Sequence, residues 1–579
     1  MRQFKGDDPV SIQLRASTRR LFGVGIISGA INLLTLSGSV YMLQVYDRVL
    51  ASRSVATLVG LSVILLSAYA FQGFFEAARS RMLARIGLLF EWNLQKSLFR
   101  TIARLPLEGT PPAAAQAPLR DVEQIRYFLS GMGPTAFLDI PWSPLFVLAL
   151  FLFHPLIGCV ALVGAGVMVA ITLSVERSSK GAAQSAAEFG AFRQVMADAC
   201  RQNADVIRAL GMTGHLVEKW VEANRRYQEQ SVKVVDVQAA LGSAAKIVRL
   251  VLQSAILGVG AYLVIIDQAS GGIMIASSIM MGRALAPVEV ALANWKQLVA
   301  SRHALERLRS VLQDDTSASG RAVALPRPCR GLRVEGLAVA PPASEAIVVS
   351  DVSFTLHAGA AVALLGSSAA GKSSLLKALV GIWPACRGHI RLDGADLNQW
   401  ASDDLGRHIG YLPQDVGLFD GTVAENIARF DRAATSEAIL QAARLAGAHE
   451  MILRLPDGYS TRISERGALL SAGQRQRLGL ARAVYGNPFL VVLDEPNSNL
   501  DADGERALKN AIQALKAAGR IVILASHRPE VLSVMDIAMV MYGGRLIACG
   551  PREEVFRKVA QFSNSARTSP ARAAELASA

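Results

Sequence analysis

The stretch Ala360-Ala-Val-Ala-Leu-Leu-Gly-Ser-Ser-Ala-Ala-Gly-Lys-Ser373 decides the fold of the second half of this chain. It joins an apolar strand, Ala360–Leu365, to a phosphate-binding pattern, G-x-x-x-x-G-K-[ST], and then to a helical stretch, Ser374–Ile382. Glycines let such a loop point its backbone N–H groups at phosphate oxygens, and the helix N-terminus adds favourable partial charge. The strand–loop–helix order therefore predicts a P-loop nucleotide site in an α/β domain.

The candidate phosphate-binding residues form one continuous run. Lys372 has the reach to contact the β- and γ-phosphates, and the Ser373 hydroxyl is suited to ligate Mg²⁺. The run consists of Gly366, Ser367, Ser368, Ala369, Ala370, Gly371, Lys372, Ser373 and Ser374.

A second apolar strand, Phe489–Leu493, ends in the carboxylates Asp494 and Glu495. The first carboxylate is placed to hold Mg²⁺, and the second is placed to activate the attacking water. Four further polar motifs surround this pair, namely Gln414 in Tyr411-Leu-Pro-Gln414, the run Leu470-Ser-Ala-Gly-Gln474, the run Ser498-Asn-Leu-Asp501, and His527. Each alone could be an ordinary surface residue, but their shared order and spacing indicate a complete nucleotide-hydrolysing domain.

The first half of the chain is apolar. The whole chain has 579 residues, of which 51% are hydrophobic and 18% are charged, with a mean hydropathy of +0.32. This composition excludes a disordered chain and disfavours a wholly soluble one. A membrane-spanning helix needs about 20 mostly apolar residues. Six stretches qualify, namely Leu21–Val45, Val55–Phe75, Thr135–Phe153, Leu156–Val175, Ile247–Ile266 and Gly272–Leu292.

The net charge of +13 predicts how these helices are oriented. Lys and Arg concentrate in two long connections, 76–134 and 176–246, whereas the short turns hold few or none. The positive-inside rule then places both long connections and both termini in the cytoplasm. Because topology accounts for the basic residues, we expect no nucleic-acid partner.

Arg283 is an ionisable residue deep within the sixth apolar stretch, about 16 Å from Gly272 at 1.5 Å per residue. Such residues are costly in the membrane and usually face an interior or a cavity. Two interpretations remain open: a residue of the transport pathway, or a structural ion pair with Asp139 or Glu289. The first interpretation predicts that Arg283→Ala reduces export and leaves nucleotide hydrolysis intact.

Gly25 and Gly29 have the GxxxG spacing that can bring two membrane helices together. Such pairs also arise by chance in glycine-rich segments. We therefore interpret this pair as a coincidence.

Residues 330–560 resemble the nucleotide-binding domain of ABC transporters, and residues 20–310 resemble the six-helix membrane domain of their exporter branch. Leu470–Gln474 is similar to the family signature, Gln414 to the Q-loop residue, and Ser498–Asp501 to the D-loop. His527 is similar to the switch histidine and Glu465-Arg466-Gly467 to the exporter X-loop. The expected fold class is a membrane all-α six-helix ABC exporter domain fused to an α/β P-loop nucleotide-binding domain.

The resemblance implies ATP and Mg²⁺ as cofactors and gives each motif a role. Lys372 would bind phosphate, Glu495 would be the general base, and His527 would orient the γ-phosphate. The implied Mg²⁺ residues are Ser373, Gln414 and Asp494. The remaining nucleotide-contacting residues are Ser471, Gly473, Gln474 and Asp501, with Ser471 and its neighbouring amides facing ATP on a second subunit. A homodimer follows, because the chain holds one membrane half and one nucleotide half.

Two departures from the family pattern matter. Ala472 stands where the signature usually has glycine, and its extra Cβ narrows the backbone freedom, so we expect slower hydrolysis. The stretch Val334–Ala346 also lacks the aromatic residue on which many members stack adenine. We therefore expect loose base selectivity, which comparable rates of GTP and ATP hydrolysis would confirm.

Several phrases are similar to the inner-membrane ATPases of type I protein secretion. They are Tyr41-Met-Leu-Gln-Val-Tyr-Asp-Arg48, Asp139-Ile-Pro-Trp142, Gly282-Arg-Ala-Leu-Ala-Pro287, Asn294-Trp-Lys296 and Asp494-Glu-Pro-Asn-Ser-Asn-Leu-Asp501. This resemblance implies a homodimeric inner-membrane exporter of proteins such as repeat-containing proteases or lipases with a C-terminal signal. Its partners would be a periplasmic adaptor and an outer-membrane channel. The alternatives are an exporter of lipid, peptide or drug, and a scaffold whose ATPase has decayed.

The expected domain order follows from these motifs. A cytoplasmic segment, 1–20, precedes the membrane domain, 21–310. A linker, 311–330, leads to the nucleotide-binding domain, 331–562, and a disordered tail, 563–579. Within the long connections, we expect the short helices that carry motion between domains near Thr110–Glu123 and Asn203–Met212.

Overall fold

The computed structural model describes residues 9–318, 325–463, 470–526 and 528–557. The chain divides into two compact units. The first, the membrane unit, consists of Met1–Pro106 and Thr110–Ala318, and the second, the nucleotide unit, consists of Leu107–Gly109 and Ser319–Ala579. The predicted tail, the X-loop motif and His527 lie outside the described residues.

The membrane unit contains six helices that are long and apolar enough to cross a membrane, which confirms the six predicted stretches. The first continues through a π-helical turn, and the third is joined from shorter pieces. The elements are α1 (Pro9–Gln44), η1 (Val45–Val49), α2 (Leu50–Ser52), α3 (Val55–Arg104), α6 (Gly133–Asp139), η3 (Ile140–Trp142), α7 (Ser143–Phe153), α8 (Pro155–Gln202), α10 (Thr213–Ile265) and α11 (Gly271–Ala293).

Three of these helices extend well beyond their apolar stretches. The helices α3, α8 and α10 have 50, 48 and 53 residues, more than twice the length that a bilayer core requires. Shorter elements lie between the membrane helices or, in the case of α12, after the last of them. They are η2 (Leu105–Glu108), α4 (Pro112–Ala115), α5 (Ala117–Ser130), α9 (Ala204–Ala209) and α12 (Trp295–Ala318). Both α4 and α9 lie inside the regions in which short helices were expected.

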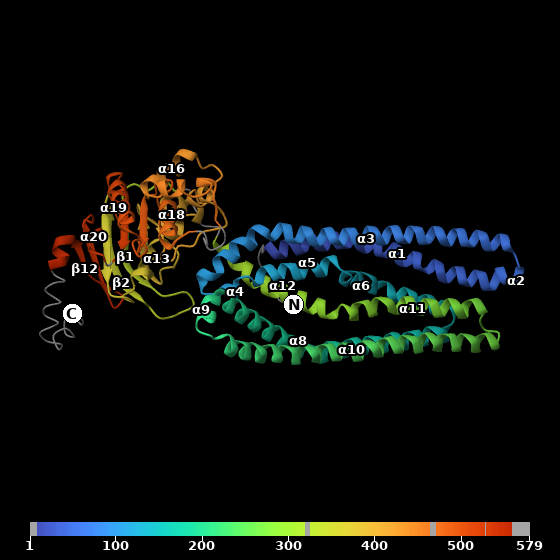
Figure 1. Cartoon of the computed structure of the whole chain (residues 1–579). Helices are drawn as coiled ribbons and strands as arrows, with labels where there is room; N and C mark the ends of the chain where they lie inside the picture. The colour runs from blue at the N-terminus through green and yellow to red at the C-terminus, as the bar shows by residue number, and fades with distance from the viewer. Residues whose placement is uncertain (1–8, 319–324, 464–469, 527, 558–579) are drawn as a thin grey trace. The chain divides into compact units, whose positions relative to one another are not determined.

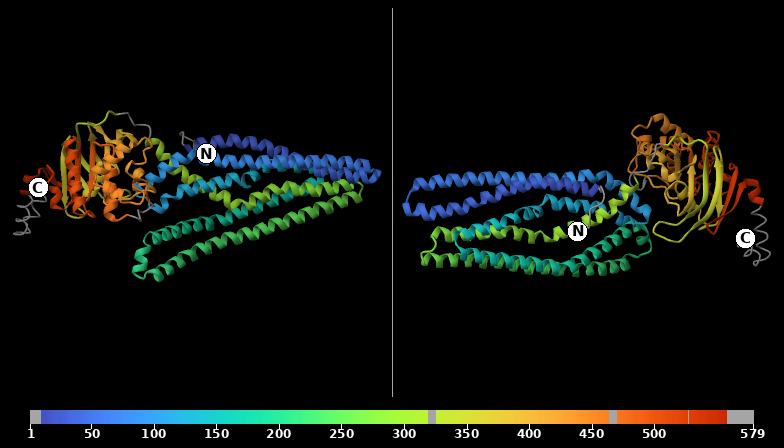
Figure 2. Two further views of the ribbon diagram at one scale, coloured as in Figure 1. Left: turned by 45° about the horizontal axis from the view of Figure 1, so that its top comes forward. Right: turned by 180° about the vertical axis from the view of Figure 1, so that it is seen from behind.

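The membrane helices pack as neighbouring pairs. Figures 1 and 2 show α8 beside α10 along most of its length, and α1 beside α3. A buried cluster that includes Phe146, Leu150, Ile157 and Met281 fills the space among α7, α8, α10 and α11. Apolar side chains from successive turns of each helix supply this cluster, as expected for an amphipathic stripe.

Gly29 lets α1 approach the Trp142 side chain closely. A Cβ atom at this position would lie 2.5 Å from Trp142 Cζ2, whereas Gly25 has only Leu138 Cδ2 at 3.7 Å. The two glycines therefore do not act as a pair: Gly29 makes room for an indole ring, and Gly25 makes only an ordinary contact, which agrees with the interpretation of the GxxxG spacing as a coincidence.

The nucleotide unit is an α/β domain built on a six-stranded sheet in the order β12-β11-β3-β10-β9-β6. A four-stranded antiparallel sheet, β2-β1-β4-β5, packs against it, and β7 pairs with β8. The strands are β1 (Gly331–Val339), β2 (Val349–His357), β3 (Ala361–Gly366), β4 (Arg387–Leu392), β5 (Ala395–Asp396), β6 (Ile409–Leu412), β7 (Gly421–Thr422), β8 (Arg462–Ile463), β9 (Leu490–Asp494), β10 (Ile521–Ala525), β11 (Ile537–Tyr542) and β12 (Arg545–Pro551).

Alternating side chains of the parallel strands contribute to two hydrophobic cores, one on each face of the six-stranded sheet. On β10, Val522 and Leu524 join the core under the helices, whereas Ile521 and Ile523 join the core shared with the four-stranded sheet. Strands buried on both faces are apolar throughout, which is why their sequences form continuous apolar runs. The helical elements are α13 (Lys372–Leu379), η4 (Leu397–Gln399), α14 (Ser402–His408), α15 (Val423–Ile427), α16 (Ser436–Leu445), α17 (His449–Leu453), η5 (Gly458–Ser460), α18 (Ala472–Val484), α19 (Ala502–Ala517) and α20 (Pro529–Leu532).

Candidate functional site

The loop after β3 is shaped by two glycines that no larger residue could replace. Gly366 has a φ of +151° and Gly371 a φ of +92°. A Cβ atom at Gly366 would lie 2.4 Å from the carbonyl oxygen of Met541, and one at Gly371 would lie 2.9 Å from that of Val348. The backbone thus curls between the end of β3 and the N-terminus of α13, as the sequence pattern predicts.

Lys372 opens α13 and folds back over this loop. Its side chain is buried, and Nζ donates hydrogen bonds to the carbonyl oxygens of Gly366, at 2.6 Å, and Ser367, at 2.9 Å. Burial lowers the pKa of Lys372, while the nearby carboxylates of Glu495 and Asp494 oppose that shift. An ammonium group has three donors and no acceptor, so phosphate oxygens can take the place of these carbonyl oxygens without leaving a proton unpaired.

Asp494 ends β9, a strand in which every residue is buried. Burial raises the pKa of Asp494, while a hydrogen bond from the Ser373 hydroxyl opposes this shift and the Glu495 carboxylate adds to it. Its Oδ1 atom is buried and has no hydrogen-bond partner among the described residues. An unpaired carboxylate oxygen beside a hydroxyl is a donor set that suits Mg²⁺, which binds through few protein oxygens and substrate phosphates.

Glu495 turns the chain away from the sheet. Its φ is +49°, in the left-handed region that non-glycine residues rarely adopt, and its N–H donates to the Ala525 carbonyl at 3.0 Å. The Gln414 side chain, which follows β6, donates to Glu495 Oε2 at 3.2 Å. Strained backbone of this kind is typical of functional sites, and here it aims the carboxylate at the Q-loop glutamine.

Gln476 is a functional candidate that the sequence reasoning missed. Its side chain is 2% exposed, and Nε2 donates to the Glu495 carbonyl at 3.0 Å and to Ser498 Oγ at 3.3 Å. Its Oε1 accepts the N–H of Asn499 at 3.0 Å. One buried amide therefore joins α18 to the turn that holds Glu495. The only available signal was its position two residues beyond Gln474.

Ser471 forms the N-cap of α18. Its Oγ accepts the N–H of Gln474 at 3.2 Å, and Gln474 Oε1 accepts the N–H of Ser471 at 2.8 Å, a complete capping box. Ala472 is the first helical residue of α18. Alanine adopts helical backbone angles readily, so its Cβ does not strain the backbone there. The close approach occurs at Gly473, where a Cβ atom would lie 2.7 Å from the Asn499 carbonyl oxygen.

Asp501 forms the N-cap of α19. Its Oδ1 accepts the N–H of Gly504 at 2.9 Å and pairs with the Arg477 guanidinium. The Gly504 N–H, followed by the Arg477 side chain, holds the pKa of Asp501 below its usual value. In this structure Asp501 is a helix cap tied to α18.

The predicted site residues thus form two groups. The first contains Lys372, Ser373, Gln414, Asp494 and Glu495, which interact with one another around the loop after β3. The second lies along α18 and the following turn, and consists of Ser471, Gly473, Gln474 and Asp501. Gln476 joins the second group to Glu495 of the first.

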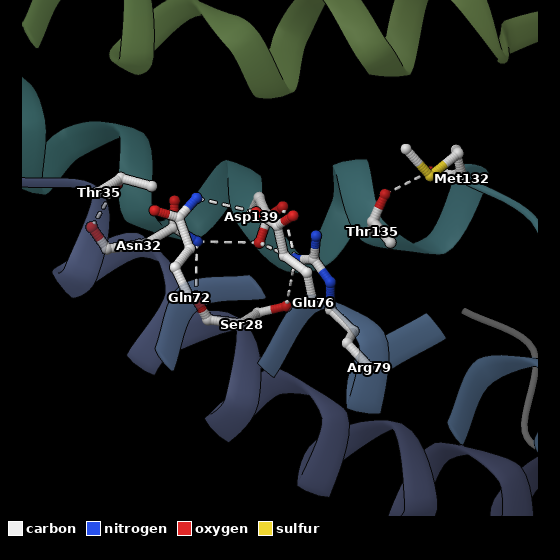
Figure 3. Close-up of polar contacts among 9 residues, drawn as sticks. All are labelled: Ser28, Asn32, Thr35, Gln72, Glu76, Arg79, Met132, Thr135 and Asp139. Carbon is white, nitrogen blue, oxygen red and sulfur yellow. Dashed lines mark hydrogen bonds and ion pairs between the residues drawn. The ribbon is translucent and has the colours of Figure 1, made fainter. Parts of the chain in front are cut away.

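The membrane unit holds its buried charges in specific pairs. Asp139 accepts hydrogen bonds from Asn32, at 2.9 Å, and from Arg79, at 3.0 Å (Figure 3). Glu289 pairs with Arg249 at 2.6 Å. The interpretation of Arg283 as the ion-pair partner of Asp139 or Glu289 is therefore wrong, because among the described residues both carboxylates pair elsewhere.

The chain is similar to known proteins along nearly its whole length. Residues 349–498 match the family "ABC transporter", and residues 21–286 match the "ABC transporter transmembrane region". The "Type I secretion system ATP-binding protein PrsD" of Rhizobium meliloti is 49% identical over 552 residues, which cover 95% of this chain and 94% of that protein.

More distant proteins agree with this match. The "Cyclolysin secretion/processing ATP-binding protein CyaB" of Bordetella pertussis is 28% identical over 539 residues, which cover 92% of this chain and 76% of that protein. A solved structure of a bacterial Atm1-family ABC exporter with ATP bound has the same fold. Its TM-score is 0.82 at 20% identity, over 93% of this chain and 96% of that one.

Proposed function

This chain belongs to the ABC transporter family, as a type I secretion ATPase that couples ATP hydrolysis to transport, and on that premise we propose that it works as a homodimer that exports proteins with a C-terminal, uncleaved signal. Proteases and lipases with repeats are the proposed kind of cargo. The observation that carries the proposal is the 49% identity to a type I secretion ATP-binding protein over 95% of the chain.

The proposed chemistry assigns each site residue a task. Lys372 and the loop amides hold the phosphates of ATP, Glu495 accepts a proton from the attacking water, and Gln414 holds that carboxylate in place. His527, the last of the sequence motifs along the chain, orients the γ-phosphate. Ser373, Gln414 and Asp494 would hold Mg²⁺, which would supply positive charge against the negative charge that develops on the phosphoryl oxygens.

The proposed homodimer explains the second group of site residues. Within the described parts of the chain, no hydrogen bond connects Ser471 with residues 366–374. We propose that Ser471, Gly473 and Gln474 instead contact ATP held by the partner subunit. Two ATP molecules would then favour the closed pair of nucleotide units, and hydrolysis would remove that preference.

The proposed location is the bacterial inner membrane, with residues 21–310 as the membrane domain and residues 331–562 as the nucleotide-binding domain in the cytoplasm. The basic residues of connections 76–134 and 176–246 support this orientation, with both termini on the cytoplasmic side. The proposed partners are a periplasmic adaptor and an outer-membrane channel, because protein released at the outer face of the inner membrane still has a second membrane to cross.

The variant Glu495→Gln tests this proposal, because it should bind ATP without turnover and hold the dimer closed. Mass spectrometry of the material that purifies with the trapped protein should identify a secreted protein and a protein with a single membrane helix. The unmodified protein, purified without ATP, serves as the control. Recovery of lipids alone would contradict protein export and would favour an exporter of lipid.

A further inference from the structure

A partly open cavity of about 150 Å³, with a mixed apolar and polar lining, lies in the membrane unit, and the proposed function does not use it. Residues of α1, α3, α6, α7 and α11 line it. Its charged lining residues are Glu76, Arg79, Asp139 and Arg283. A cavity of this volume admits a group about the size of benzene, which corresponds to a single side chain and not to folded structure.

The cavity lies in one half of the membrane. Arg283 is twelve residues from the start of α11 at Gly271, or about 18 Å, and Asp139 is fourteen residues from the end of α7 at Phe153, or about 21 Å. Arg79 is 24 residues from the start of α3 at Val55, or about 36 Å. Since the hydrocarbon core is about 30 Å thick, the cavity occupies the half nearer the long connections, where cargo from the cytoplasm would enter.

One wall of the cavity is a closed network around Asp139. Arg79 Nη1 donates to both carboxylate oxygens, at 3.0 and 3.1 Å, and to Ser28 Oγ at 3.1 Å (Figure 3). Asn32 Nδ2 donates to Asp139 Oδ1 at 2.9 Å and to the Ser28 carbonyl at 2.8 Å. The charge of Asp139 is therefore neutralised by Arg79 within the protein.

One guanidinium group at this cavity is available to an entering group. Arg79 Nε has no hydrogen-bond partner among the described residues, but this atom is buried and does not face the cavity. Arg283 lines the same cavity and forms no ion pair within the described part of the chain. Glu76, the remaining charged lining residue, accepts a hydrogen bond from Gln72 of its own helix at 2.9 Å. The Arg283 side chain is exposed, so its guanidinium can be reached from the cavity. An unpaired guanidinium favours a carboxylate, which it binds in a planar, paired geometry.

The helix that carries Arg283 lacks one backbone hydrogen bond at the cavity. Pro287, which lines it too, lies inside α11 and has no N–H. The carbonyl oxygen four residues earlier, that of Arg283, therefore cannot receive its helical hydrogen bond.

We propose that this cavity binds a carboxylate group of the exported polypeptide, with Arg283 as the cation that pairs with it. The inference rests on the proposed function, since it takes a polypeptide as the cargo. The carboxylate is either that of an Asp or Glu side chain or that of the C-terminus of the exported chain.

The test uses the full chain in lipid nanodiscs and three fluorescent peptides of one polar sequence. The first has an internal Glu and an amidated C-terminus, the second an internal Gln and a free C-terminal carboxylate, and the third an internal Gln and an amidated C-terminus. Fluorescence anisotropy should show the first or the second peptide binding about tenfold more tightly than the third. The tighter of the two identifies the source of the carboxylate.

Variants of the cavity then assign the effect to Arg283. Arg283→Gln should abolish the preference for a carboxylate, Arg283→Lys should keep part of it, and Glu76→Gln should strengthen binding by removing a like charge. Arg302→Gln is the matched control, because Arg302 is an exposed arginine of α12 that pairs with Glu306. ATP hydrolysis is measured in parallel to show that each variant is folded.

The outcomes separate this inference from the proposed function. Equal binding of all three peptides with stimulated ATP hydrolysis would overturn the carboxylate site and leave polypeptide export standing. A preference that survives in Arg283→Gln would also overturn the site. If no peptide binds or alters hydrolysis, both this inference and polypeptide export are contradicted.

Discussion

In the nucleotide unit, Asp494 and Glu495 are adjacent in the sequence and both lie near Lys372, which belongs to a loop of one continuous run. In the membrane unit, Asp139 is held by Arg79 and Asn32, which lie 60 and 107 residues away in the sequence. The first unit thus places its chemistry in contiguous motifs at the ends of buried strands. The second has isolated charges on long helices, and each paired charge has its partner far away in the sequence.

This difference predicts where a substitution acts. A change at Glu495 should alter a reaction and leave the folded chain stable. A change at the pair of Arg79 and Asp139 in the membrane unit should alter stability and transport and leave the reaction intact. The first two of the four predictions below test that division, and the other two concern a helix contact and a helix cap.

The largest effect is expected for Glu495→Gln. Loss of a general base lowers kcat by about 10²–10⁴-fold, while the binding of ATP remains, because Lys372 and the loop after β3 are unchanged. Steady-state ATP hydrolysis and binding of a fluorescent ATP analogue are the measurements. Glu437→Gln, at the exposed start of α16, is the control. Hydrolysis near the unmodified rate in Glu495→Gln would assign the base elsewhere.

The next effect is expected for Arg79→Gln. The Arg79 and Asp139 side chains are only 11% and 18% exposed, so removal of the cation leaves a buried carboxylate without its partner. The free energy of unfolding should fall by about 3–5 kcal/mol, measured by thermal unfolding in detergent.

Arg225→Gln provides the matched control for that measurement. Arg225 pairs with Glu222 on the surface of α10 and is 65% exposed. An exposed pair contributes about 0.2–1 kcal/mol, so this variant should unfold nearly as the unmodified chain does. Equal losses in the two variants would mean that the pair of Arg79 and Asp139 is no more important than a surface contact.

A smaller effect is expected for Gly29→Ala. The new methyl group would overlap the Trp142 ring and force α1 or the indole to shift, which should cost about 1–3 kcal/mol in the same unfolding assay. Gly23→Ala, two turns away on the same helix, has nothing within 4 Å of its new Cβ and should be neutral or slightly stabilising. A neutral Gly29→Ala would show that the helix pair adapts without cost.

The smallest effect is expected for Asp501→Asn and depends on pH. The Gly504 N–H and Arg477 lower the folded-state pKa of Asp501 below its ordinary 3.8. Its stabilisation is therefore fully present above pH 3.8 and is lost as the pH falls through the folded-state pKa. The difference in melting temperature between the unmodified chain and Asp501→Asn should be present at neutral pH and vanish in that acidic range.

Asp420→Asn, in an exposed turn, is the control for the acid measurement. It should leave the pH dependence of the melting temperature as it is in the unmodified chain. A difference for Asp501→Asn that persists at acid pH would show that the carboxylate charge is not what stabilises the cap.

Much of the nucleotide unit could be predicted from the sequence because its motifs are local. The loop from Gly366 to Ser373 joins β3 to α13, as its motif predicts, and the roles of its residues stay a prediction. Gln476 could not be predicted in this way, since a buried amide looks like any other polar residue of an amphipathic helix. We expected the side chain of Ala472 to restrict the backbone, because the family signature has glycine at this position. The structure has a helical residue there, and alanine adopts helical backbone readily.

In the membrane unit, hydropathy predicted the six helices but not the partners of their charges. Arg283, Asp139 and Glu289 were considered as partners of one another because they lie within apolar stretches. Arg79 lies on the continuation of α3 beyond its apolar stretch, and Arg249 is on α10. Pairing between helices depends on how they rotate about their axes, which no local pattern of a single helix determines.

The length of α10 has a mechanical consequence. Its 53 residues extend about 80 Å, and the bilayer core takes up about 30 Å of that length. The remainder, about 50 Å, is a lever arm. A tilt of about 5° within the membrane moves the far end by about 4 Å, which is more than the length of a hydrogen bond. Displacements too small to break the packing of Ile256 and Leu263 in the buried cluster can therefore make or break contacts at the other end of α10.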